Sequence, residues 1–316
     1  MLRHLISTIF RMTSASGINF SLYSDTMRLQ YYVDEEGESV IGLWIPKRRE
    51  FIDVTAQDEQ LWAAMLPDGK KLRKEIETWI AKGAPDGVAV DMKGLVVSSA
   101  LHVQPNTIAC LGKCYAAHAQ EFSGDSQVSE PSLFLKATSA ISSDLSYVLN
   151  PDGATKLDYE VELAVIIGDT LHRASEAEAR RAILGYTLMC DYSERSYQLE
   201  HGGQWTKGKS YDTFAPFGPI LVTKDEIHDP DHLQLQLKVN GEVRQSASTS
   251  ELIMPVAALV AYVSQYITLN PGDVVSTGTP GGVGMGMTPP RYLKLGDIVE
   301  FSCDAIGAVS QTVEQE

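Results

Sequence analysis

The sequence predicts a β-rich α+β protein in which a larger part follows a small N-terminal part. Its 316 residues are 44% hydrophobic and 21% charged, which is an ordinary globular composition. Short runs typical of strands recur along the whole chain, and the few helical patterns between them do not alternate regularly with the strands. This irregular order favours a mixed α+β arrangement over a doubly wound parallel sheet.

The N-terminal part is predicted as a small sheet followed by one helix. Breaks rich in Gly, Pro and charged residues separate three strand-like runs, at residues 27–33, 39–46 and 50–56. Apolar residues then recur at about helical spacing over Gln60 to Lys82. We place the domain boundary near residue 100, after an apolar run, which gives a small domain over 27–100 and a catalytic domain over 101–316.

Residues 1–26 are predicted as an N-terminal extension of unknown role. Met1 to Ser24 contain Arg3, Arg11, several Ser and Thr, and no acidic residue. This composition leaves three interpretations open: a transit peptide, a misassigned start before Met27, or an accessory arm. We expect a cytoplasmic protein, or a mitochondrial one if the extension is a transit peptide.

Strand-like runs dominate the second part of the chain. They lie at residues 107–112, 161–168, 233–243, 273–278 and 297–303. Helical patterns are fewer, and two of them cover residues 175–185 and 251–266. These runs predict a sheet-rich catalytic domain with helices at irregular intervals.

The charge and composition of the chain argue against several classes of partner. A formal net charge of −15 opposes binding to a phosphate backbone, which needs a clustered basic surface, so no nucleic-acid partner is expected. No apolar run approaches the roughly 20 residues of a membrane-spanning helix, so no membrane partner is expected either. The four cysteines show no CxxC pair, which is typical of free thiols in a reducing compartment.

Two acidic residues in one strand-like run are the first candidate metal ligands. If this run forms a strand, Glu160 and Glu162 point to the same face. Adjacent carboxylates repel each other unless water, a basic partner or a cation neutralises them, and oxygen-only ligands suit Mg²⁺, Mn²⁺ or Ca²⁺ rather than Zn²⁺. The solvated face of an edge strand is the alternative. Asp191 follows the apolar stretch 183–190, where a strand end could place a third carboxylate beside the pair.

His118 and Glu121 form a candidate acid/base pair. The turn at Gly112 is followed by a helical pattern, and helical spacing puts both side chains on one side of it. A carboxylate beside an imidazole raises the basicity of the ring and fixes its orientation, as activation of water near neutral pH requires. A surface ion pair is the alternative interpretation of the same spacing.

Three other motif matches are rejected on their context. Gly203 to Ser210 satisfies the phosphate-loop pattern GxxxxGK[ST], but the polar Glu200-His201-Gly202 precedes it where an apolar strand is needed. The glycine-rich segment 278–286 lacks the GxGxxG spacing of dinucleotide-binding folds. His228 to His232 is interpreted as a polar turn rather than a metal site.

Taken together, the segments beyond about Thr107 resemble the fumarylacetoacetate hydrolase family. The motifs that carry the resemblance occur in family order and are GKCYAAHAQEF, FLKATSAIS, LDYEVELAVIIG, GYTLMCDYSERSYQ, GKSYDTFAPFGP, VNGEVRQ, PGDVVSTGTPGGVG and LKLGDIVEFS. The chain departs from the family pattern at a few positions. Cys114 and Cys190 stand where asparagine is common, Ser196 where aspartate is common, and Ala137 where proline often follows the lysine. Substrate specificity therefore does not follow from the resemblance.

The resemblance implies a mixed β-sandwich roll for the catalytic domain, and a homodimer. It implies Mg²⁺, or else Mn²⁺ or Ca²⁺, on the positions that match the family's metal ligands, which are Glu160, Glu162 and Asp191. His118 and Glu121 match the family's water-activating dyad, and Lys209 matches its electrophilic catalyst. The substrate contacts implied in the same way are Tyr115, Arg195, Gln198 and Thr279.

The reaction implied by the resemblance is hydrolytic cleavage of a carbon–carbon bond in a small β-dicarbonyl acid, such as an acylpyruvate or a fumarylacetoacetate-like compound. The dyad would deprotonate water, and the cation and Lys209 would stabilise the departing enolate. Two alternatives stay open. One is a decarboxylase, isomerase or lyase that uses the same metal site on a related oxo acid, and the other is a binding protein without turnover.

Overall fold

The computed structural model describes residues 28–316 apart from 35–37, 46, 49, 58–69, 86, 91–95, 102–103, 124–129 and 143–144. The N-terminal extension over 1–26 lies outside the described residues. So does the first part of the helix predicted from Gln60 to Lys82, while its second part is confirmed as α3 (Lys70–Ala81).

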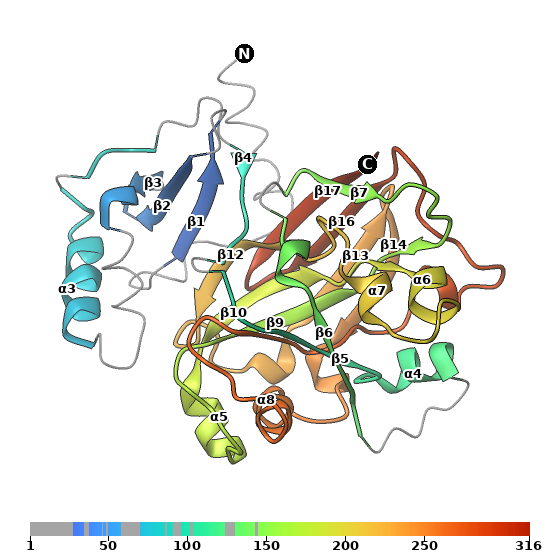
Figure 1. Cartoon of the computed structure of the whole chain (residues 1–316). Helices are drawn as coiled ribbons and strands as arrows, with labels where there is room; N and C mark the ends of the chain where they lie inside the picture. Colours follow the sequence, from blue (N-terminus) through green and yellow to red (C-terminus); the bar gives the residue numbers. More distant parts are fainter. Residues whose placement is uncertain are drawn as a thin grey trace.

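One ten-stranded sheet runs through both parts of the chain, with strand order β3-β2-β1-β12-β10-β9-β15-β5-β6 and β4 paired to β1 (Figure 1). Because β1 pairs with β12, the sheet crosses the boundary predicted near residue 100, and the division into two domains stays a prediction. The strands are β1 (Arg28–Val33), β2 (Ser39–Ile45), β3 (Glu50–Asp53), β4 (Val96–Val97), β5 (Ile108–Gly112), β6 (Ser132–Lys136), β9 (Val161–Ile167), β10 (Ile183–Cys190), β12 (Phe217–Thr223) and β15 (Val274–Ser276).

A second, five-stranded sheet has the order β14-β13-β16-β17-β7 and packs against β9, β10 and β12 of the first. Its strands are β7 (Tyr147–Asn150), β13 (Gln234–Val239), β14 (Glu242–Ser248), β16 (Ile298–Cys303) and β17 (Gly307–Gln315), and a separate two-stranded pair joins β8 (Leu157–Asp158) to β11 (Ser193–Glu194). Most strand pairs are antiparallel, but β15 with β5 and β17 with β7 are parallel. The β-rich α+β class is therefore confirmed.

The helices are short and lie at the margins of the sheets (Figure 1). Besides α3, they are α4 (Ala116–Ser123), α5 (Glu176–Ala182), α6 (Arg195–Leu199), α7 (Thr206–Lys209) and α8 (Val256–Ser264), with 3₁₀ turns η2 (Thr55–Gln57), η4 (Thr138–Ala140), η5 (Pro230–His232), η6 (Thr249–Glu251) and η7 (Gly284–Gly286). Among the described residues, no helix is long and apolar enough to cross a membrane.

Two of the predicted helices are shorter in the structure than in the prediction. A capping box between Ser175 and Glu178 starts α5, but the helix ends at Ala182 and residues 183–185 belong to β10, so the prediction was wrong there. The helix predicted from Glu251 begins only at Val256, because residues before it form the turn η6 and a proline segment.

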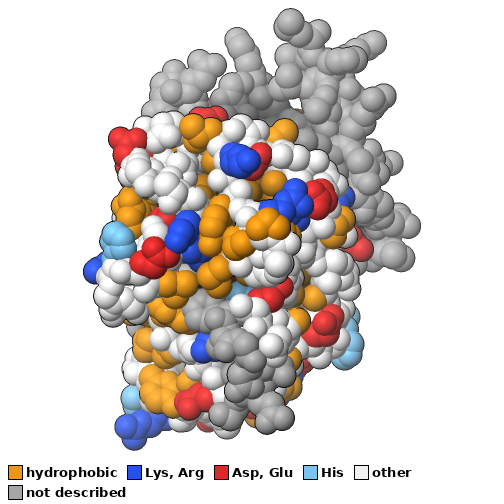
Figure 2. All heavy atoms as spheres, turned by 90° about the vertical axis from the view of Figure 1, so that its right-hand side faces the viewer, with side chains coloured by type: hydrophobic (Ala, Val, Ile, Leu, Met, Phe, Trp, Pro, Cys, Tyr) orange, Lys and Arg blue, Asp and Glu red, His pale blue; other side chains and the backbone are white. Residues whose placement is uncertain are grey.

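The centre of the molecule is formed by β9 and β10, whose residues are all buried. Outside this core, the face turned to the viewer in Figure 2 mixes acidic, basic and hydrophobic side chains. Lys and Arg do not gather into a broad field among the described residues of that face. The absence of a nucleic-acid partner remains a prediction.

Candidate metal centre and acid/base site

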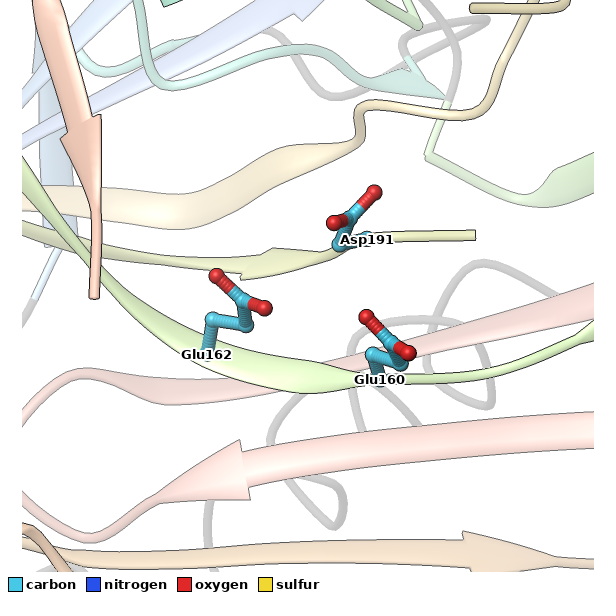
Figure 3. Close-up of side chains that lie close together, drawn as sticks. All are labelled: Glu160, Glu162 and Asp191. Carbon is cyan, nitrogen blue, oxygen red and sulfur yellow. The ribbon is translucent and has the colours of Figure 1, made fainter. Parts of the chain in front are cut away.

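The three predicted metal ligands come from two neighbouring strands. Glu160 directly precedes β9, Glu162 is the second residue of β9, and Asp191 directly follows β10. The strands are antiparallel with Met189 opposite Glu162, and the Asp191 amide donates to the Glu160 carbonyl at 2.8 Å. This register brings the three carboxylates to one side of the sheet, as Figure 3 shows. Their ligand oxygens lie within 4.8 Å of one another.

The carboxylates are buried, so the alternative of a solvated edge strand is wrong. Three buried cations surround them instead. Lys209 Nζ lies 2.7 Å from Glu160 Oε2 and 2.7 Å from Asp191 Oδ2. Arg195 Nη2 lies 2.6 Å from Glu160 Oε1, and Lys136 Nζ donates to Asp191 Oδ1 at 2.5 Å. Lys209 ends the four-residue helix α7, an arrangement that does not fit a phosphate loop.

Glu160 and Glu162 have opposite electrostatic surroundings. Burial alone raises the pKa of Glu160, but the charges of Lys209 and Arg195 outweigh it, so the pKa of Glu160 lies below its ordinary value. Burial also raises the pKa of Glu162, and there the negative charges of Asp191 and Glu160 add to it. Neutral groups solvate Glu162, whose Oε2 accepts from Ser276 Oγ at 2.5 Å and from the Gly278 amide at 3.0 Å.

The cluster fits a hard divalent cation. Glu160, Glu162 and Asp191 offer only oxygen ligands, which suit Mg²⁺, Mn²⁺ or Ca²⁺ better than softer metals. Burial and the charges of Asp191 and Glu160 raise the pKa of Glu162 more than Lys209 lowers it, so the negative charge of this carboxylate is only partly compensated. A cation between the three carboxylates would complete that compensation, because an opposite charge favours the ionised form.

His118 lies between Glu121 and the carboxylate cluster. His118 and Glu121 both belong to α4. His118 Nδ1 is 3.6 Å from Glu121 Oε2, and His118 Nε2 is 3.9 Å from Glu160 Oε1. The imidazole is buried, which contradicts the alternative of a surface ion pair. The 3.6 Å separation is longer than a direct hydrogen bond, although catalytic hydrogen bonds often tighten when substrate binds. The Gly282 amide holds Glu121 by donating to its Oε1 at 2.8 Å.

A narrow pocket brings most of the predicted site residues together. Its polar lining includes His118, Glu160, Glu162, Gln198, Lys209 and Thr279, and its apolar lining includes Leu111, Phe134 and Trp205. Arg195 and Asp191 lie behind this lining in contact with Glu160 and Lys209. Tyr115, by contrast, is not among the residues that line the pocket. Its substrate role, like the roles of the other residues, stays a prediction.

Gln198 and Thr279 are each held by a buried neighbour. Gln198 Oε1 accepts from Arg195 Nη1 at 3.0 Å. The Thr279 hydroxyl donates to the Val161 carbonyl at 2.9 Å and accepts from Gln245 Nε2 at 2.8 Å. The sequence analysis did not single out Gln245, although it ends the motif VNGEVRQ.

Lys136 and Ser276 were also missed as parts of the site. Lys136 ends the strand β6, where a lysine usually reaches solvent, yet here it is buried against Asp191. Ser276 ends β15 and reaches Glu162 across the sheet. A lysine or serine in an apolar strand-like run was the available signal, but a single sequence does not show which strand lies opposite.

Comparison with known proteins identifies the family. The family described as fumarylacetoacetate (FAA) hydrolase C-terminal matches residues 107–314, so the chain belongs to the fumarylacetoacetate hydrolase family. A 2,4-didehydro-3-deoxy-L-rhamnonate hydrolase from a Sphingomonas species is 46% identical over 209 residues, which cover 66% of this chain and 73% of that protein.

Solved structures of the family share the fold over most of the chain. The fumarylacetoacetate hydrolase of Exiguobacterium antarcticum has a TM-score of 0.73 at 31% identity, covering 92% of this chain and 100% of that one. A 2-hydroxyhepta-2,4-diene-1,7-dioate isomerase from Mycobacterium marinum has a TM-score of 0.68 at 28% identity over 92% and 99%. The fumarylpyruvate hydrolase of Pseudomonas aeruginosa, solved with Mn²⁺ and pyruvate, has a TM-score of 0.61 at 32% identity over 67% and 91%. The fold implied by the family resemblance is thus confirmed.

Proposed function

We propose that this protein is a metal-dependent hydrolase that cleaves a carbon–carbon bond in a small β-dicarbonyl acid, with Mg²⁺ as its cation and Mn²⁺ or Ca²⁺ as alternatives. The observation that carries the proposal is the place of His118, whose Nε2 faces the carboxylate cluster while its Nδ1 faces Glu121. A base beside a metal centre suits a reaction in which water must be deprotonated.

Glu160, Glu162 and Asp191 would hold the cation, which would supply Lewis-acid polarisation of a substrate oxygen. Glu121 orients the imidazole so that Nε2 accepts a proton from a water molecule. The water oxygen then adds to the distal carbonyl carbon, and the adjacent carbon–carbon bond breaks. Its electron pair leaves as an enolate, which takes up a proton, and the other fragment leaves as a carboxylic acid.

The charge of the site supports an anionic substrate. Four buried carboxylates, Glu160, Glu162, Asp191 and Asp158, face the three cations Lys136, Lys209 and Arg195. A divalent cation added to this set would change the sum of these charges from one negative to one positive. Lys209 and Arg195 would then stabilise a carboxylate in the ground state and the negative charge of the departing enolate.

The relatives support the substrate class without fixing the compound. The name of the Sphingomonas enzyme describes a 3-deoxy sugar acid with carbonyl groups at positions 2 and 4, which is a β-dicarbonyl acid. The Pseudomonas enzyme is a fumarylpyruvate hydrolase. The Mycobacterium isomerase favours the second candidate in the form of an isomerisation of an enol acid. The homodimer and the cytoplasmic location also remain proposals.

Product analysis separates these reactions. Protein loaded with Mg²⁺ or Mn²⁺ would be incubated with acylpyruvates, fumarylpyruvate, 2,4-dioxo-3-deoxy sugar acids and oxaloacetate, and the products identified by NMR. We expect pyruvate plus a carboxylic acid from at least one dioxo acid. An isomer of unchanged mass, or CO₂ from oxaloacetate alone, would favour the second candidate. No turnover together with no metal uptake would favour a binding protein.

The dyad can be tested against a matched pair elsewhere on the chain. His232 and Asp229 have the same spacing of three residues, with His232 Nδ1 2.7 Å from Asp229 Oδ2, but both side chains are exposed. We expect His118→Asn to lower hydrolysis by roughly 10²- to 10⁴-fold while metal binding persists. His232→Asn should leave both unchanged. Equal hydrolysis by His118→Asn and the natural protein would contradict the assignment.

A further inference from the structure

Asp158 is a buried carboxylate that the proposed reaction does not use. It ends the short strand β8 and is fully shielded from solvent. Four donors converge on its two oxygens. Oδ1 accepts from the Tyr159 amide at 2.9 Å and the Gly284 amide at 2.7 Å. Oδ2 accepts from Arg195 Nε at 2.8 Å and the Met285 amide at 3.0 Å.

On one side, Asp158 fixes the orientation of Arg195. The guanidinium contacts three side chains: Asp158 through Nε, Gln198 through Nη1, and Glu160 through Nη2 at 2.6 Å. A guanidinium is a rigid planar fork, so a carboxylate held at Nε sets the direction of the other two nitrogens. Asp158 is the partner in this set that was assigned neither to metal nor to substrate.

On the other side, Asp158 anchors a glycine-rich segment that also holds the dyad. Amides of Gly284 and Met285 donate to Asp158, and the Gly282 amide donates to Glu121. A Cβ on Gly284 would stand 2.7 Å from Asp158 Oδ1, and one on Gly286 would stand 2.7 Å from Glu121 Cδ. The segment 282–286 therefore fits closely between the two carboxylates and requires glycine there.

We propose that Asp158 is a positioning residue: by fixing Arg195 it sets the direction of Gln198, which lines the pocket, toward the carboxylate of the substrate, and it ties the Glu121 anchor to the same point. The proposal rests on the proposed function for its substrate class. Asp158→Asn tests it, because asparagine has one oxygen where aspartate has two. That oxygen can accept from Arg195 or from the Gly284 amide, and the NH₂ group that replaces the second oxygen repels the donors on its side. Arg195 then loses its fixed direction while the three metal ligands stay intact.

The control is Asp273→Asn. Asp273 is equally buried and accepts from the amides of Thr107 and Asn270 at 2.9 and 2.8 Å, but it lies at the opposite end of β15 from Ser276. Thermal melts would show whether the two variants are destabilised alike. Both would then be assayed well below the lower melting midpoint, so that a loss confined to Asp158→Asn reports on the site.

The measurements are KM and kcat for the acid that the natural protein hydrolyses, and the Kd of pyruvate by calorimetry on Mn²⁺-loaded protein. We expect Asp158→Asn to raise KM and the Kd of pyruvate by roughly tenfold or more, with Mn²⁺ affinity changed far less. Asp273→Asn should match the natural protein. A purely structural role would lower kcat through a smaller active fraction and leave KM and Kd unchanged, and that outcome would overturn the proposal.

A double-mutant cycle with Arg195→Lys makes the test specific. In the Arg195→Lys background, Asp158→Asn should change the Kd of pyruvate by less than about twofold, because the oriented fork is already gone. The same tenfold factor in both backgrounds would overturn the coupling. If the natural protein hydrolyses none of the acids, the proposed function fails, and pyruvate binding in the cycle still decides whether Asp158 acts through Arg195.

Discussion

Glu160 and Glu162 lie two residues apart on one face of the sheet, yet the two sides of the cluster are built differently. The Glu160 side is cationic, with Lys209 at 2.7 Å and Arg195 at 2.6 Å. The Glu162 side is neutral, with Ser276 and the Gly278 amide as donors. The pKa of Glu160 is accordingly lowered, while burial and two neighbouring carboxylates raise the pKa of Glu162.

This difference explains how the metal-free protein can hold three carboxylates in a buried cluster. Lys209 and Arg195 lower the pKa of Glu160, so this ligand is ionised before a metal binds, and Lys209 also pairs with Asp191. Burial and the neighbouring carboxylates leave Glu162 with the raised pKa, so its ionised form is the less well compensated of the two glutamates. A divalent cation should stabilise the ionised form of Glu162 more than that of Glu160. The cation either displaces a proton from Glu162 or reduces its repulsion by Asp191 and Glu160.

The largest expected effect comes from making the same substitution on both sides. Glu160→Gln leaves Lys209 and Arg195 short of a buried counter-charge, so we expect the free energy of unfolding of the metal-free protein to fall by roughly 3 kcal/mol. Glu162→Gln removes the carboxylate that is least stable when ionised, so unfolding should become harder by roughly 1 kcal/mol. Urea titrations in the presence of a chelator would measure the free energy of unfolding of each variant. Equal destabilisation of the two would contradict the difference between the Glu160 and Glu162 sides of the cluster.

Both variants should nevertheless lose metal binding and turnover, because each removes a proposed ligand. For Glu162→Gln, a gain of stability together with a loss of function is the pattern expected of a site residue. Glu176→Gln, on the exposed face of α5 where Glu176 pairs with Arg180, is a control that should change neither property.

The sequence predicted those features of the site that depend on the local spacing of residues along a strand or a helix. Glu160 and Glu162 share a face because alternate residues of a strand do, and His118 and Glu121 share a side of α4 because helical spacing puts them there. The cations that distinguish the two glutamates, Arg195 and Lys209, come from α6 and α7, far along the chain. Family motifs pointed to Arg195 and Lys209. Lys136 lies in an apolar strand-like run, but that run does not show that Asp191 lies beside the lysine.

The strands missed from the sequence have physical causes. Pro219 lies within β12, where a proline argues against a strand, and it is accommodated near a shift in the register between β12 and β10. In β17, Gln311 occupies an inward position and donates to the Tyr147 carbonyl at 2.7 Å, which interrupts the apolar alternation. The pairing of β1 with β12 joins residues too distant in sequence for any periodicity to reveal.

The next effect concerns pH. The folded pKa of Glu162 is raised above its ordinary value of 4.5, so its contribution to stability is fully present below pH 4.5 and is lost as pH rises through the folded pKa. The pKa of Glu160 is lowered, so the contribution of Glu160 to stability is lost as pH falls, and only below the ordinary pKa of a glutamate. Above pH 4.5 the metal-free protein should therefore lose stability as pH rises.

A cation reverses this loss, because it takes the place of the proton on Glu162. The difference in melting midpoint between Mn²⁺-loaded and chelated protein should grow as pH rises above 4.5, the ordinary pKa of a glutamate. Glu162→Gln is the control, and its chelated form should lack the part of the pH dependence that comes from this residue. A midpoint difference that shrinks with rising pH would contradict the assignment.

The smallest expected effect tests the role of the neutral groups that donate to Glu162. Ser276→Ala removes the hydroxyl that donates to Glu162 Oε2 but leaves the Gly278 amide in place. We expect the Kd for Mn²⁺ to rise about fivefold, equivalent to roughly 1 kcal/mol, the usual value of one hydrogen bond. The matched control is Ser193→Ala, because Ser193 is buried and donates at 3.0 Å to the backbone carbonyl of Asp191 rather than to its carboxylate. If both variants weaken Mn²⁺ binding equally, the loss reflects packing around the cluster, and Ser276 does not hold Glu162 for the metal.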